Sequence, residues 1–132
     1  MRSLVIIILT CLVTVWSTPS LAELRVVGKG ETLRFDSSQF PPEIKRSYDV
    51  MAVRCSTCHS QHRIVMAYIT GVAPVSKKPF DNDVMKITTF RMLRKAGLTL
   101  PEGLSKEQRK VIIEERRAIA SVLNYLMDES TR

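Results

Sequence analysis

Five consecutive residues, 55–59, carry the most specific chemistry of this sequence. They are Cys-Ser-Thr-Cys-His, and Cys-x-x-Cys-His is the pattern at which a c-type haem is attached. The thiols of Cys55 and Cys58 can add across the two vinyl groups of one porphyrin, and the imidazole of His59 then binds its iron. Because only two residues separate the cysteines, a short turn places both sulfurs along one edge of the ring. The motif therefore predicts one covalently bound haem c per chain.

Two other chemistries match the same residues less well. Together with His62 the motif offers four zinc ligands, but four ligands within residues 55–62 leave little slack for a tetrahedral site. A thioredoxin-like dithiol needs a strand–helix–strand pattern around the cysteines, which this sequence lacks. His62 follows His59 by three residues, so we expect it at the surface or at the propionate edge, on the same side of the ring.

A methionine is the expected second axial ligand, because His/Met coordination is typical of electron-transfer haems. Met51 and Met66 are too near the motif in sequence to reach the other face of the ring, and Met127 falls in the last turns of the final predicted helix. Met85 and Met92 remain, and their spacing of seven places them on one face of a helix. For each of these residues the alternative is an ordinary core methionine, since Met fills irregular apolar gaps.

Residues 1–22 have the form of a secretory signal peptide. Arg2 precedes the apolar run 4–16, and Ser20-Leu21-Ala22 has the small-x-small form of a cleavage site. This run is shorter than the roughly 18–20 residues that span a bilayer. We therefore expect cleavage and a periplasmic location, with an uncleaved membrane anchor as the alternative. Cys11 leaves with the signal, so Cys55 and Cys58 are the only cysteines after residue 22.

The motif is predicted to follow an N-terminal arm and one helix. Residues 23–40 alternate between apolar and polar around two glycines, which indicates a short hairpin or an extended arm. A helix is expected to start at Pro41-Pro42. Ile44, Tyr48, Met51 and Cys55 then recur at helical spacing and lead into the motif.

Further helical signals follow the motif. Residues 63–69 are mostly apolar, and a loop bracketed by two prolines follows them. Asp81 or Asn82 can cap a helix that runs to about residue 96 and is stopped by Gly97, with its apolar positions at Val84, Ile87, Phe90 and Met92. Ser105 and Gln108 have the form of a capping box for a last helix, which runs to about residue 127. The chain is therefore predicted to be one all-α domain.

The charge of the chain is strongly basic. The formal net charge is +7, and it is +6 without Arg2. An exported chain without aromatic stacking motifs is not expected to bind nucleic acid. Steering toward acidic protein surfaces or anionic lipid is one consequence of the charge, and a solvated surface without a specific partner is the other. Arg54 and Arg63 flank the motif and are candidates to neutralise haem propionates, with solvated helix charges as the alternative.

The order of these features resembles class I cytochrome c, and in particular the single-haem bacterial cytochromes of that class. The similarity covers roughly residues 41–127 and includes Ser60, Arg63-Ile64, the segment 92–98 (Met-Leu-Arg-Lys-Ala-Gly-Leu) and the closing Asn124-Tyr125-Leu126. It implies that residues 41–132 form a small helical, cytochrome c-like domain around one haem, which follows the predicted signal peptide (1–22) and arm (23–40). It also implies that Met92 is the distal ligand, with Met85 as second choice, and that the carbonyl of Pro74 accepts the second ring proton of His59.

These expectations describe an electron carrier rather than an enzyme, because no acid–base or nucleophilic machinery accompanies the motif and the cofactor carries the chemistry. The expected partners are redox proteins with acidic docking surfaces, and membrane association is expected to be transient or absent. Two alternatives stay open. In the first alternative, the chain is a haem subunit of a larger oxidoreductase. In the second, it is a five-coordinate haem protein that binds a small ligand or peroxide.

Overall fold

A computed structural model describes residues 24–131 of the chain. The predicted signal peptide therefore lies outside the described residues. Within them, no helix is long and apolar enough to cross a membrane.

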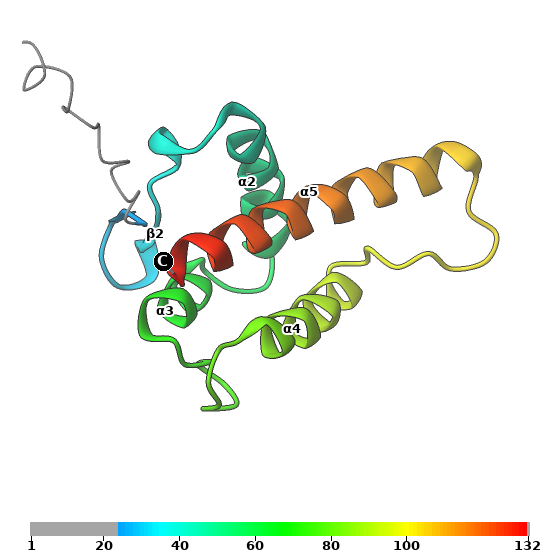
Figure 1. The fold of residues 1–132 in the computed structure, drawn as a ribbon. Coiled ribbons are helices and arrows are strands. Elements are labelled where there is room, and N and C mark those ends of the chain that lie inside the picture. The colour runs from blue at the N-terminus through cyan, green and yellow to red at the C-terminus, as the bar shows by residue number, and fades with distance from the viewer. Residues whose placement is uncertain (1–23, 132) are drawn as a thin grey trace, which may run out of the picture.

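Four α-helices make up most of the described part of the chain (Figure 1). They are α2 (Pro42–Cys55), α3 (His62–Thr70), α4 (Asn82–Lys95) and α5 (Lys106–Ser130). Helix α5 crosses α2 (Figure 1), and Phe40, just before α2, packs on Tyr125 while Arg54 at the end of α2 pairs with Glu115. Helix α5 also contacts α3 and α4, so it joins the other three helices. The all-helical prediction is confirmed.

The helix ends are set by local side-chain chemistry. Asp81 accepts hydrogen bonds from the backbone N–H groups of Asp83 (3.1 Å) and Val84 (2.8 Å), which caps α4. Ser105 and Gln108 form the predicted capping box, with bonds of 3.2 and 3.0 Å. These two starts were predicted from the sequence. Helix α5 continues to Ser130, three residues beyond the predicted end.

Helix α4 agrees with the sequence prediction at some apolar positions and differs at others. Phe90, expected on the apolar face, is 60% exposed, whereas Ile87 is 55% exposed but lines the cavity described below. The buried positions are Met85 and Thr89, one turn apart. The amphipathic pattern of α4 is weak, so its neighbours rather than its own periodicity determine which face points inward.

The N-terminal arm is a short hairpin followed by a turn. Strand β1 (Val26–Val27) pairs antiparallel with β2 (Arg34–Phe35), and the single-turn 3₁₀ helix η1 (Gly30–Thr32) lies between them. A Cβ atom on Gly28, at φ +91°, would lie 2.3 Å from the backbone oxygen of Thr32, so the turn requires glycine there. A second 3₁₀ turn, η2 (Ser37–Gln39), leads into α2. Both β2 and η1 contact α3, whereas η2 contacts α2.

The arm contributes two aromatic rings to the core of the domain. Phe35 and Phe40 are both buried, and they belong to the same apolar cluster as the buried faces of α2, α3 and α5. Six rings form a continuous series of edge-to-face pairs, which we call the aromatic chain, with centroid separations of 5.0–6.5 Å in the order Tyr125–Phe40–Tyr48–Phe35–Tyr68–Phe80. The arm is thus joined to α2, α3 and α5 through packed aromatic contacts.

Candidate functional site

A cavity of about 630 Å³ lies where the end of α2, α3, the loop after α3 and α4 meet. Its size falls within the range of roughly 300–1,000 Å³ that is usual for cofactor and ligand sites. All five residues predicted to hold the cofactor line it, namely Cys55, Cys58, His59, Met85 and Met92. The fold therefore brings together, in one cavity, residues that are up to 37 positions apart in the sequence.

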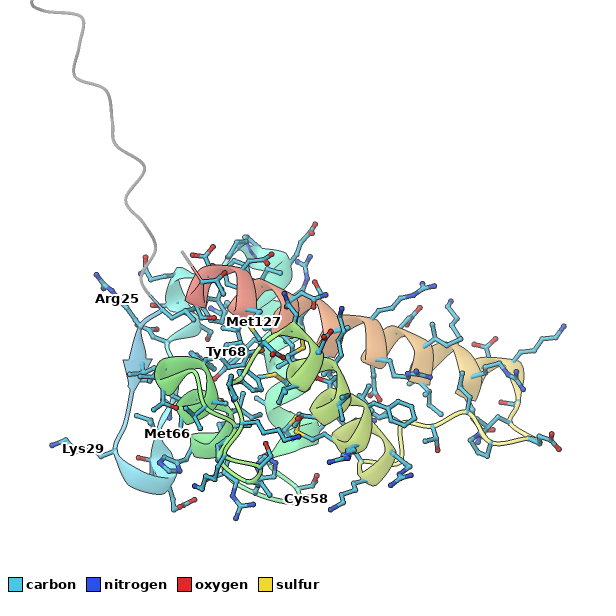
Figure 2. All side chains as sticks on the ribbon, turned by 60° about the horizontal axis from the view of Figure 1, so that its bottom comes forward. Arg25, Lys29, Cys58, Met66, Tyr68 and Met127 are labelled. Atoms are coloured by element: carbon cyan, nitrogen blue, oxygen red, sulfur yellow. The ribbon has the colours of Figure 1, made fainter. Side chains whose placement is uncertain are left out.

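A short turn at the end of α2 positions the two cysteines. Helix α2 ends at Cys55, and the backbone N–H of Cys58 donates to the Cys55 carbonyl over 3.4 Å. The Thr57 hydroxyl donates to the Arg54 carbonyl over 2.7 Å, which satisfies an orphan carbonyl of the helix end. Cys55 is partly buried, whereas Cys58 is exposed and lies at the edge of the molecule in Figure 2. This is the short turn that the spacing of the motif predicts.

The imidazole of His59 is held by a backbone carbonyl. Its Nδ1 lies 2.8 Å from the Ser60 carbonyl oxygen. A carbonyl only accepts hydrogen bonds, so Nδ1 is the donor in this contact, and in the neutral imidazole Nε2 is then the nitrogen with the free lone pair. Histidine ligands of metals are oriented in this way, with the second nitrogen donating to a carbonyl or carboxylate. The resemblance implied Pro74 as the acceptor. Pro74 lines the cavity, but the accepting oxygen is that of Ser60, because the turn after His59 brings it next to the ring.

Two of the methionines in the described part of the chain line the cavity. Met85 is 4% exposed, and its sulfur accepts a hydrogen bond from the Thr89 hydroxyl at 3.7 Å. Met92 is partly buried, two turns further along α4. Met66 and Met127, which are labelled in Figure 2, are not among the lining residues.

The wall of the cavity combines an apolar floor with a cationic rim. Ile64, Ala67, Ile119 and Leu123 supply buried apolar surface. No Asp or Glu occurs among the described residues that line it. Six cationic side chains do line it, and we call them the cationic rim: Arg54, Arg63, Lys78, Arg91, Arg94 and Lys95. The cavity is therefore suited to a large apolar molecule that carries anionic groups at its edge.

Arg54 is held in place by α5. Its guanidinium forms an ion pair with Glu115, with Nη2 at 2.5 Å and Nε at 3.2 Å from Oε1. The other carboxylate oxygen of Glu115 is buried without a hydrogen-bond partner among the described residues. This contact joins the helix that leads into the motif to the middle of α5.

The pKa of the Cys55 thiol is raised to about 11, mainly by burial and to a smaller extent by the neighbouring Cys58. Cys55 therefore remains a protonated thiol at neutral pH. The thiolate is the form that attacks disulfides and binds zinc. Among residues 24–131, moreover, no group of three or more His, Cys, Asp and Glu side chains is arranged to hold a metal ion. A centre that uses one histidine and one methionine does not require such a group.

Several lining residues were not singled out from the sequence. Lys78 and the three cations of α4 were recognised only as general basic charge, although Arg91, Arg94 and Lys95 recur at helical spacing. Tyr68 and Phe80 line the cavity as one edge-to-face pair. No protein-family model, no curated protein and no solved structure matches this chain.

Proposed function

We propose that this chain is an exported c-type cytochrome that carries one electron between protein partners, and that residues 41–132 form its cytochrome c-like domain. The observation that carries the proposal is the shared cavity, in which a Cys-x-x-Cys-His turn and two methionines of α4 line one apolar space. The signal-like segment 1–22 supports export to the periplasm, where such a haem is attached.

The residues of the cavity fit a haem. Cys55 and Cys58 would form the thioether bonds, and His59 would offer Nε2, since its Nδ1 proton is already donated to Ser60. Met92 is the proposed distal ligand because it lies nearer the Gly97-Leu98 turn, and Met85, whose sulfur accepts a hydrogen bond from Thr89, is the second choice. When bound, the haem supplies reversible one-electron exchange at its iron.

The rest of the cavity provides the environment for that exchange. Its apolar floor excludes water, which lowers the local dielectric constant around the metal ligands. The cationic rim provides partners for two propionates and leaves positive charge at the cavity mouth. Such a surface raises the encounter rate with acidic redox proteins, so the chain acts as a carrier and its partners perform the catalysis.

The test is to express the full chain together with a haem-attachment system and to measure the mass and absorption spectrum of the purified protein. The proposal predicts one covalent haem and the weak red band of ferric iron bound to a thioether sulfur. A colourless chain with the mass of the bare peptide contradicts it. A high-spin spectrum with haem attached instead supports the five-coordinate ligand-binding alternative, and co-purification of a second polypeptide supports a subunit of a larger oxidoreductase.

Three alanine variants then identify the distal ligand. Met92→Ala is expected to abolish the red band, whereas Met85→Ala is expected to keep it. Met66→Ala is the matched control, because this methionine is partly buried and is not part of the cavity wall. Loss of the band in Met85→Ala alone would assign the ligand to Met85.

A further inference from the structure

The segment that carries His59 has no regular secondary structure of its own. Helix α2 ends at Cys55 and α3 begins at His62, so the turn 56–61 must be held by other contacts. The ring of His59 is oriented by the Ser60 carbonyl, as described above. The orientation of the Ser60 peptide therefore determines where Nε2 points.

Two side-chain hydrogen bonds hold the residues directly after His59. The Ser60 hydroxyl donates to a carboxylate oxygen of Glu31, in the η1 turn of the N-terminal arm. The next residue, Gln61, accepts a hydrogen bond from the Tyr48 hydroxyl through its side-chain oxygen. We call these two contacts the Ser60 tether and the Gln61 tether.

The Gln61 tether is anchored in the core. Tyr48 is 4% exposed, and its hydroxyl also lies 3.3 Å from the carbonyl oxygen of Phe35 in strand β2. Burial raises the pKa of Tyr48, so its hydroxyl stays protonated and able to donate at neutral pH. The ring of Tyr48 packs edge-to-face on Phe35, which is 1% exposed. The arm thus bonds the turn directly through the Glu31 carboxylate, and its Phe35 packs on Tyr48 of α2, which holds Gln61.

We infer that the N-terminal arm, residues 24–40, positions the iron ligand His59. Glu31 of the arm, and Tyr48 of α2 on which Phe35 of the arm packs, are positioning residues that fix the Ser60–Gln61 segment, and this segment fixes the imidazole through the Ser60 carbonyl. The inference rests on the proposed function, in which Nε2 of His59 binds iron. It adds to that function a role for the arm, which lies outside the part of the chain that resembles cytochromes.

The test follows the Nδ1 proton of His59 by NMR in the mature chain, in whichever form it purifies. Removal of one tether by Ser60→Ala or Tyr48→Phe is expected to make solvent exchange of this proton about 3- to 10-fold faster, as a hydrogen bond of ordinary strength allows. Glu31→Ala is expected to act like Ser60→Ala. Glu31→Gln is expected to restore slow exchange, since an amide oxygen can accept the same hydrogen bond.

Ser105→Ala is the matched control for general destabilisation. It removes the cap of α5, far from the turn in sequence, at a cost similar to that of a lost tether. In this variant the solvent exchange rate of the His59 Nδ1 proton is expected to stay at the wild-type value. In the haem-loaded protein, Tyr48→Phe and Ser60→Ala are also expected to raise the pH midpoint at which acid displaces His59 by about 0.5 to 1 unit, whereas Ser105→Ala leaves it unchanged.

The outcomes separate the two claims. Equal exchange rates in the tether variants, the control and the wild type overturn the positioning role, with or without haem. A chain that purifies without haem overturns the proposed function, and the exchange rates then judge the tethers alone. Fast exchange in Tyr48→Phe together with Ser105→Ala would show a loss of fold rather than of positioning, and it would also overturn the inference.

Discussion

Replacement of Phe35 by alanine is expected to destabilise the domain strongly, although Phe35 lies in the N-terminal arm. Its side chain is almost fully buried, and its ring meets Tyr48 at 6.5 Å and Tyr68 at 5.8 Å between centroids. Truncation of a buried phenylalanine costs about 3–5 kcal/mol, from lost apolar burial and from the cavity left behind. The two aromatic pairs place Phe35→Ala in the upper half of that range.

Phe90→Ala is the matched control, since it makes the same chemical change at a largely exposed position on α4. It is expected to change the free energy of unfolding by less than about 1 kcal/mol. Urea unfolding of the mature chain, followed by far-ultraviolet circular dichroism, measures both values. Small domains are stable by only about 5–15 kcal/mol, so Phe35→Ala should be compared at low temperature. Equal costs for the two variants would refute the placement of the arm in the core.

Three further predictions concern the turn, the ion pair and the arm. The pKa of Cys55 is raised from 9.0 to about 11 in the folded chain, so the haem-free, reduced protein should lose up to about 2–3 kcal/mol of stability between pH 9 and 11. A thioether at this position has no proton to lose and should abolish this loss. Urea unfolding midpoints measured across this pH range test the prediction. Arg54→Ala should lower the free energy of unfolding by about 1–3 kcal/mol in the same assay, because it leaves the half-buried Glu115 carboxylate unpaired. Glu115→Leu should change it by less than about 1 kcal/mol, because the more exposed guanidinium of Arg54 can reach water. The opposite order of the two costs would contradict this account. Gly28→Ala should destabilise clearly more than Gly30→Ala by thermal unfolding, since both glycines have positive φ but only the first has a backbone oxygen in the place of the new Cβ.

The helix starts were predictable because they depend on local chemistry. Asp81 and Ser105 satisfy the first N–H groups of the helices that they precede, and a few neighbouring residues contain all the information needed. The motif was equally local, because five consecutive residues define it. The choice of Met85 and Met92 rested on sequence separation, which excluded Met51 and Met66, and on the place of Met127 in the last turns of the final helix.

Other features depend on contacts that the sequence does not display. The burial of Phe35 requires the arm to fold back on α2 and α3, and nothing in its hairpin pattern selects that surface. The Arg54–Glu115 pair joins residues 61 positions apart. The exposure of Phe90 on α4 results from how this helix packs against neighbouring elements, and its own sequence pattern does not determine such packing.

The aromatic chain also determines how this protein can be observed. All three tyrosines of the sequence, Tyr48, Tyr68 and Tyr125, belong to it, and the single tryptophan, Trp16, falls within the predicted signal peptide. Once that segment is removed, all tyrosine fluorescence of the protein originates from this one series of rings. Tyr68 lines the cavity, so a cofactor bound there that absorbs in the ultraviolet would quench the tyrosine fluorescence. This fluorescence would therefore report both on occupation of the cavity and on packing of the arm against the helices.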